Sequence, residues 1–239
     1  VAILDWMKKN GEKIDHCLVG EPTSPSKMGE MMKIGRRGSI TAKIIAKGIQ
    51  GHSAYPDRAN NPIIAMIKLL DTLASHQLDV GTEHFDPSTL AVTTIDTGNK
   101  ASNVIPASTK AVVNIRFNDS HSGQSLISWL EDEMEKVSVE YGIKFETDFK
   151  ITGESFITPP GELSDLILKA VKKELGVIPK LSTTGGTSDA RFIKNVCPVT
   201  EFGLVGKTMH AVDEKVEIKQ INQLKEIYTR ILEAYFAEV

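Results

Sequence analysis

Two possible metal ligands stand far apart in the sequence. Glu21 follows the apolar run 14–19 through a glycine, so we expect its carboxylate at the carboxyl end of a buried strand, where open α/β sheets place their sites. His210 follows the glycine-containing segment 203–208, shortly before the final helical pattern. Carboxylate oxygens and imidazole nitrogens are both zinc ligands. An exposed loop carboxylate and a structural histidine are the alternatives, and one Glu and one His do not by themselves make a metal site.

His52 is a possible hydrogen-bond donor to an oxyanion. It lies in Gly48-Ile-Gln-Gly-His-Ser-Ala-Tyr-Pro56, where two glycines allow a sharp turn at a strand exit and present His52 and Tyr55 on a loop. A neutral imidazole there can stabilise a developing negative charge. The alternative is a partly buried histidine held by local hydrogen bonds, and the residues alone favour that alternative.

Groups that bind anions occur at three further places. Arg36 and Arg37 form a paired guanidinium turn, and Arg116 follows an alternating strand pattern. Guanidinium groups bind carboxylates bidentately, although a surface charge is the alternative for each. The loop 183–189 offers adjacent backbone N–H groups, which suit a carboxylate or an oxyanion, although its Gly-Gly pair can also be a flexible turn. The sequence contains no GxSxG, HExxH or Walker motif, which argues against nucleophilic, zincin-type and nucleotide-binding sites.

Composition indicates an ordinary globular protein without a polyanionic partner. The 239 residues are 41% hydrophobic and 25% charged, with a formal net charge of -3 and a pI of about 6.1. This balance gives no general attraction to nucleic acid or to an anionic membrane, and no apolar run approaches the roughly 18–20 residues of a membrane span. Cys17 and Cys197 lie in apolar runs, which suits buried thiols in a reducing cytoplasm.

The pattern over residues 38–150 predicts a small α+β domain. Alternating strands are expected at 39–47, 89–96, 109–118 and 143–151, with helices at 62–75 and 123–140. This β-α-β-β-α-β order is typical of a split-βαβ, ferredoxin-like sandwich. Residues 31–34 are expected to pair with 39–47 as a hairpin. The first helix is expected to bury one face, made by Ile63, Ile64, Ile67, Leu70 and Leu73.

The flanking segments 1–37 and 151–239 carry α/β patterns with few strands. We therefore expect one incomplete α/β domain into which the small domain is inserted. Because the chain opens within a helical pattern that has no capping residue, a preceding segment is also expected.

Seven motifs, read in order, resemble the family of di-zinc amidohydrolases and peptidases that includes desuccinylases, acetylornithine deacetylase, aminoacylases and carboxypeptidases. They are Val19-Gly-Glu21-Pro, Gly35-Arg-Arg-Gly-Ser39, Gly48-Ile-Gln-Gly-His-Ser-Ala-Tyr-Pro56, Asn60-Asn-Pro62, Asn103-Val-Ile-Pro106, Gly185-Gly-Thr-Ser-Asp189 and His210. The resemblance spans nearly the whole chain and is nearest to the desuccinylase branch. It implies a catalytic α/β domain with an inserted lid and dimerisation domain.

The resemblance also implies roles for individual residues. Glu21 and His210 would be ligands of a two-zinc centre, in which cobalt can substitute. His52 would come from the inserted domain of a partner subunit in a homodimer, and would stabilise the oxyanion. A small dicarboxylate amide would be the substrate, contacted by Arg36, Arg37, Ser39, Tyr55, Asn103, Arg116, Gly186 and Thr187.

One part of the family pattern has no counterpart in residues 1–239. The family's His-x-Asp metal motif, its bridging aspartate and its pair of adjacent glutamates, one of them the catalytic base, are expected in a segment before residue 1. The chain by itself is therefore expected to be inactive. A deacylase acting on another acyl group and a non-catalytic dimerisation module are the alternatives.

Overall fold

The computed structural model describes residues 2–186 and 188–237, which form two compact units. Unit 1 comprises Val1–Arg37 and Phe156–Val239, and unit 2 comprises Gly38–Ser155. The second boundary lies beyond the expected residue 150, because strand β9 continues to Gly153 and pairs there with Ser39.

Unit 1 is built on a four-stranded sheet in the order β1-β12-β2-β11. These strands are β1 (Cys17–Val19), β12 (Val199–Glu201), β2 (Met31–Lys33) and β11 (Lys180–Ser182). Helices α4 (Glu162–Leu175) and α6 (Ile218–Ala237) pack on it and bury Met32, Ile167, Val171, Phe202 and Ile227. Helices α1 (Ala2–Asn10) and α5 (Ala190–Ile193) complete the unit, and the short strands β3 (Gly35–Arg36) and β10 (Phe156–Ile157) pair antiparallel.

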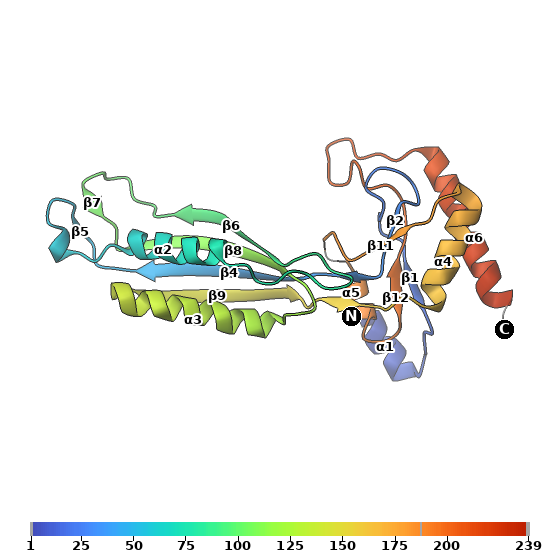
Figure 1. Cartoon of the computed structure of the whole chain (residues 1–239), viewed down its shortest axis with the longest axis horizontal. Coiled ribbons are helices and arrows are strands. Elements are labelled where there is room, and N and C mark those ends of the chain that lie inside the picture. Colours follow the sequence, from blue (N-terminus) through green and yellow to red (C-terminus); the bar gives the residue numbers. More distant parts are fainter. Residues whose placement is uncertain (1, 187, 238–239) are drawn as a thin grey trace. The chain divides into compact units, whose positions relative to one another are not determined.

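Unit 2 is an antiparallel sheet with two helices on one face (Figure 1). The sheet order is β6-β8-β4-β9, formed by β4 (Gly38–Lys47), β6 (Thr89–Asp96), β8 (Ser108–Phe117) and β9 (Lys144–Gly153). Helices α2 (Pro62–Ser75) and α3 (Gly123–Tyr141) cover a core in which alternate strand residues are buried, among them Ile40, Ile44, Val113 and Ile115. The order is the expected β-α-β-β-α-β pattern. A ribbon of β5 (Gly51–His52) and β7 (Val104–Ile105) and the single turn η1 (Pro56–Arg58) were not expected.

Local sequence signals account for the helix ends of unit 2. The Asn61 side chain accepts a hydrogen bond from the Ile63 N–H, and Pro62 occupies the first turn of α2 as expected. Ser122 and Ser125 form a reciprocal capping box at the start of α3, and Gly142, with φ of 61°, ends that helix in the left-handed region.

Two expectations about packing were wrong. Residues 31–34 do not pair with 39–47: β2 lies between β12 and β11 in unit 1, whereas β4 pairs with β8 and β9 in unit 2. The expected apolar face of α2 is wrong in part: Leu70 and Leu73 are buried as expected, but Ile64 and Ile67 remain 50% and 53% exposed, and Ala65, Met66 and Leu69 face the core. An almost uniformly apolar helix carries no periodic signal to choose its buried side.

Among the described residues, no helix combines the length and apolar character that crossing a membrane requires.

Candidate active site

The loops that carry Glu21 and His210 are joined by hydrogen bonds in unit 1. The segment after β1 runs beside the segment after β12. Thr23 and Ser24 donate their N–H groups to the Leu204 carbonyl at 3.2 and 3.4 Å, and Gly206 N–H donates to the Ser24 carbonyl at 2.9 Å. A side chain at Gly203 would collide with the backbone of Glu21 and Gly20. The close approach of these two loops therefore depends on a glycine.

His210 lies in an exposed loop with a left-handed backbone. Its φ is 62°, an uncommon conformation for a residue with a side chain, and Asp213 shares it. The Thr208 hydroxyl closes this loop, because it donates to the Lys215 carbonyl at 2.8 Å and accepts from the Lys215 N–H at 3.1 Å. Unusual backbone conformations persist where the surroundings enforce them, and they are concentrated at functional sites.

The described residues do not complete a metal site. Glu21 and His210 supply a carboxylate and an imidazole, yet residues 2–186 and 188–237 contain no group of three or more His, Cys, Asp or Glu side chains able to hold an ion. Zinc in proteins normally takes at least three protein ligands. The described residues therefore do not by themselves make up a two-metal centre.

His52 and Asn103 are neighbours in unit 2. Strand β5 pairs with β7 so that His52 lies opposite Val104, and the Ser53 N–H donates to the Asn103 carbonyl at 3.0 Å. The Ala54 N–H donates to Nδ1 of His52 at 3.0 Å. Since Nδ1 accepts a hydrogen bond, the neutral ring carries its proton on Nε2. The exposed His52 therefore presents a hydrogen-bond donor to solvent.

Tyr55 adjoins His52 on the same turn. Its N–H donates to the His52 carbonyl at 2.9 Å, and the two rings meet edge to face with centroids 5.8 Å apart. The Arg58 guanidinium lies over the Tyr55 ring, 4.9 Å from its centroid. The local sequence thus places an imidazole, a phenol and a cation on one exposed turn.

Arg36 forms a buried ion pair, an arrangement that the sequence did not reveal. Its Nε donates to Glu201 Oε1 at 3.1 Å, its Nη2 contacts Glu201 Oε2, and its Nη1 donates to the Thr184 carbonyl at 3.2 Å. Arg36 is 7% exposed and Glu201 is 2% exposed. The Ser188 hydroxyl also donates to Glu201 Oε1. This pair anchors the chain on both sides of the exposed Gly185 and Gly186, whereas Thr187 lies outside the described residues.

Lys33 is a second buried cation that the sequence analysis missed. Its Nζ donates to Thr184 Oγ1 at 2.8 Å and to Ser182 Oγ at 3.2 Å, and it contacts Met31 Sδ at 2.8 Å. Burial, together with the nearby Arg36 charge, lowers the pKa of Lys33 to about 8. An isolated lysine in an apolar strand run carries no sequence signal for this position.

Ser39 and Arg116 lie directly opposite each other on β4 and β8, so their side chains project from the same sheet face in unit 2. Asn114 lies beside them and donates to Ser39 Oγ at 3.5 Å and to Thr41 Oγ1 at 3.0 Å.

Arg37 belongs to unit 1, where its Nε is buried without a hydrogen-bond partner among the described residues. The candidate residues thus divide between the two units. Those that belong to unit 1 are Glu21, Arg36, Arg37, Gly186 and His210. Those that belong to unit 2 are Ser39, His52, Tyr55, Asn103 and Arg116.

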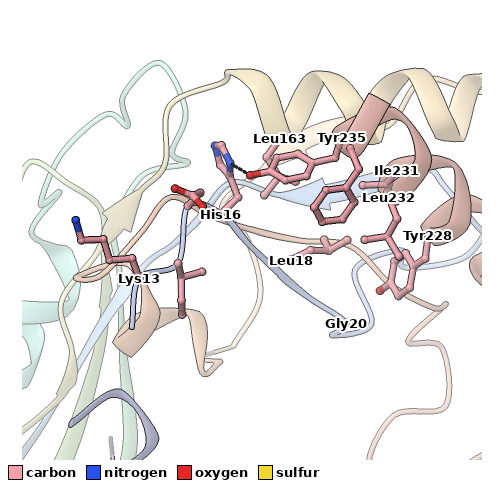
Figure 2. Close-up of a pocket in the computed structure, with 12 residues that line it drawn as sticks. Lys13, His16, Leu18, Gly20, Leu163, Tyr228, Ile231, Leu232 and Tyr235 are labelled. Atoms are coloured by element: carbon pink, nitrogen blue, oxygen red, sulfur yellow. Dashed lines mark hydrogen bonds between the residues drawn. The ribbon is translucent and has the colours of Figure 1, made fainter. Parts of the chain in front are cut away.

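A pocket of about 490 Å³ in unit 1 contains none of these residues (Figure 2). It lies between β1 and α6 and is lined mainly by apolar side chains, among them Leu18, Leu163 and Ile231. Its polar contact is His16 Nδ1 to the Tyr235 hydroxyl at 3.4 Å. Its charged lining residues are Lys13 and Asp15, and no candidate site residue lines it.

Comparison with known proteins relates the chain to amide hydrolases. A family profile described as a peptidase dimerisation domain matches residues 34–142. The chain is 65% identical over 237 residues to a succinyl-diaminopimelate desuccinylase of Cereibacter sphaeroides and 65% identical over 236 residues to that of Ruegeria pomeroyi. Each match covers 99% of this chain and 62% of the relative.

Solved structures show the same fold at low sequence identity. A tripeptidase from Staphylococcus aureus has a TM-score of 0.79 at 17% identity, covering 93% of this chain and 57% of that one. A metallo-carboxypeptidase from Sulfolobus solfataricus has a TM-score of 0.74 at 15% identity, covering 98% of this chain and 67% of that one. Residues 34–142 thus match the profile of a peptidase dimerisation domain, and almost the whole chain is similar to succinyl-diaminopimelate desuccinylase sequences, of which it spans 62%.

Proposed function

We propose that the protein containing this chain hydrolyses the amide bond of N-succinyl-LL-2,6-diaminopimelate to succinate and LL-2,6-diaminopimelate, in the cytoplasmic synthesis of diaminopimelate and lysine. The observation that carries the proposal is the identity of 65% to named desuccinylases over 99% of the chain. The arrangement of the candidate residues supports it.

His52 has the properties of an oxyanion donor. Its Nδ1 is occupied by the Ala54 N–H, so its Nε2–H is the free donor, and the side chain is exposed on the β5-β7 ribbon. In the proposed homodimer this ribbon reaches the site of the partner subunit. A preorganised donor aimed at the tetrahedral oxyanion contributes about 3 kcal/mol to transition-state stabilisation.

The succinyl carboxylate requires positive charge and N–H donors. Unit 1 offers the exposed Gly186 backbone beside the buried cations Lys33 and Arg36, and unit 2 offers Arg116 on the face shared with Ser39. We propose that Gly186, Thr187 and Arg116 bind this carboxylate, and that Tyr55, Asn103, Ser39, Arg36 and Arg37 line the remainder of the substrate site.

Two zinc ions are the cofactor that the proposal implies, with cobalt as a substitute. Glu21 and His210 are the proposed ligands from this chain, and a bound metal would supply an acidified water as the nucleophile. The described residues offer neither the remaining ligands nor a carboxylate base for that water. We therefore propose that the 239-residue chain by itself does not hydrolyse the substrate.

Unit 2 is the proposed dimerisation surface, with β6 as the pairing edge. The two edge strands of its sheet differ in charge. β9 carries Lys144, Glu146, Asp148 and Lys150, and charged residues along an edge oppose pairing with another chain. β6 has the sequence TLAVTTID, with Val92 38% exposed and Ile95 53% exposed. Together with the exposed Ile64 and Ile67 of α2, it offers an unpaired edge beside an apolar surface.

The test is an assay of the full-length protein with zinc, using the N-succinyl and N-acetyl forms of the same diamino acid. We expect succinate release with a kcat/KM for the succinyl form at least tenfold higher. Preference for the acetyl form would identify a related deacylase. Dimer formation without hydrolysis of either substrate would identify a non-catalytic dimerisation module.

A further inference from the structure

The strongest new observation is the set of contacts around the Arg36–Glu201 pair. The two residues are 165 positions apart in sequence, and both are almost completely buried. Removing water from two charges costs several kcal/mol per ion, which their attraction offsets only when the hydrogen bonds are well placed. A buried ion pair is therefore weak evidence that its residues serve only to stabilise the fold. The contacts of this pair indicate another role.

The pair contacts the chain on both sides of Gly185 and Gly186. Arg36 Nη1 donates to the carbonyl of Thr184, immediately before the glycines, and Glu201 accepts from the hydroxyl of Ser188, shortly after them. Gly185 has a φ of 107°, and a Cβ atom there would collide with Nη1 of Arg36. The guanidinium therefore lies directly against the glycine backbone and leaves no room for a side chain.

The charges of this cluster also favour an anionic ligand nearby. Glu201 neutralises Arg36, while Lys33 donates only to the neutral oxygens of Ser182 and Thr184 and contacts the sulfur of Met31. The cluster formed by Lys33, Arg36 and Glu201 thus carries one net positive charge. Because these groups are buried, their field is weakly screened.

We propose that Glu201, through Arg36 and Ser188, is a positioning residue that orients the Gly185–Gly186 backbone and so sets the preference for an anionic acyl group. The identity of the anionic ligand in this inference rests on the proposed function. The orientation of the glycine backbone by Glu201 does not depend on that function. The carboxylate is too buried to contact substrate, and it acts through the two residues that it holds.

The informative variant is Ser188→Ala. Glu201 Oε1 also accepts from Arg36 Nε, so losing the Ser188 hydroxyl does not leave the carboxylate without a partner. Ser26→Ala is the matched control, because the Ser26 hydroxyl donates to Glu30 Oε2 at 3.1 Å at an exposed position of the same unit. Glu201→Gln is a stronger variant that removes the charge, and Ser188→Ala keeps the test valid should that variant fail to fold.

The first measurement is the NMR backbone order parameter of the Gly185 and Gly186 amides in the 239-residue chain. We expect values near about 0.85 in the unmodified chain and in Ser26→Ala, and below about 0.6 in Ser188→Ala, with little change elsewhere. Order parameters that are unchanged in Ser188→Ala would overturn the proposal. This measurement requires no catalytic activity, so it remains decisive even when the proposed reaction is not observed.

The second measurement is the kinetics of the same variants in the full-length protein. We expect Ser188→Ala to raise KM for the succinyl substrate about tenfold, with kcat nearly unchanged and no comparable effect on the acetyl substrate, whose acyl group carries no charge. An equal rise for both substrates would overturn the role in anion preference. Absence of turnover in the unmodified full-length protein would instead contradict the proposed function.

Discussion

At the scale of single residues, His52 shows how a backbone contact selects the chemistry of a side chain. The Ala54 N–H occupies Nδ1, so the neutral imidazole can donate only through Nε2. The sequence placed His52 on a loop but left a purely structural histidine as the better alternative. Only the three-dimensional contact determines which nitrogen carries the proton.

His52→Ala in the full-length protein is expected to lower kcat by about 100-fold to 1,000-fold, since it removes one oxyanion donor. The measurement is steady-state hydrolysis of the succinyl substrate, with a smaller change expected in KM. His76→Ala is the matched control, because His76 lies in the same unit and stacks on Trp129. A kcat for His52→Ala equal to that of the control would show that His52 does not act in the reaction.

The burial of Lys33 gives the stability of the fold a measurable dependence on pH. Its pKa is about 8 in the folded chain and near 10.5 when exposed, so the unfolded chain binds more protons between these values. Stability therefore rises with pH across this window, and below pH 8 the buried charge destabilises the fold by an amount on the order of 3 kcal/mol. The hydroxyls of Ser182 and Thr184 lie 2.9 Å apart and can bond each other when Lys33 is absent.

Lys33→Met is therefore expected to remove the rise in unfolding free energy between pH 8 and 10.5, and to match or exceed the stability of the unmodified chain at pH 7. Urea unfolding at several pH values measures both effects. Lys169→Met controls for the loss of a lysine charge, because Lys169 is an exposed lysine of helix α4 in the same unit. If the unfolding free energy of Lys33→Met still rises between pH 8 and 10.5, the rise comes from another titratable group.

At the scale of elements, the two edges of the unit 2 sheet are not equivalent. β9 is protected by alternating charges, including the Lys43–Asp148 and Lys47–Glu146 ion pairs at 3.3 and 3.2 Å. β6 has no charged residue before Asp96. Exposed surface ion pairs contribute little to the stability of the fold. The charges of β9 instead disfavour pairing of this edge with another chain.

Ile95→Lys is expected to convert a dimer of the 239-residue chain into a monomer, because it places a charge on the proposed pairing edge at a side chain that is 53% exposed. Sedimentation velocity at several concentrations measures this. Thr147→Lys puts the same charge on the exposed surface of β9 and is expected to leave the dimer intact. If the two variants sediment alike, the dimer interface does not lie at the β6 edge.

At the scale of the whole molecule, the chain passes between the two units only at residues 37–38 and 155–156. Arg36 pairs with Phe156 and Gly35 pairs with Ile157, so the two crossing segments lie side by side in unit 1. The core of unit 2 is formed entirely from residues between Ile40 and Ile143. Each unit therefore has its own buried core, which is the requirement for independent folding.

Residues 38–155 expressed alone are expected to fold. Unit 1 is expected to tolerate replacement of 38–155 by a short glycine linker, because the ends to be joined are already adjacent. Dispersed NMR spectra that overlay those of the full chain would confirm both statements. A disordered spectrum for residues 38–155 would show that unit 2 depends on unit 1.

Local patterns were sufficient wherever the determining interactions are local. The Asn61 cap, the Ser122 capping box and the alternating strands of unit 2 act over a few residues, so the helix boundaries and the β-α-β-β-α-β order could be predicted from the sequence. Glu21, His52 and His210 were instead singled out by the resemblance of their motifs to a known enzyme family.

Tertiary structure alone decided the features that depend on contacts between distant segments. These are the placement of β2 between β12 and β11, the buried side of α2, and the Arg36–Glu201 pair that holds Thr184 and Ser188. Each depends on which remote surface is available to bury an apolar side chain or to pair with a charge. No periodicity within a short window contains that information, because the partner lies elsewhere in the chain.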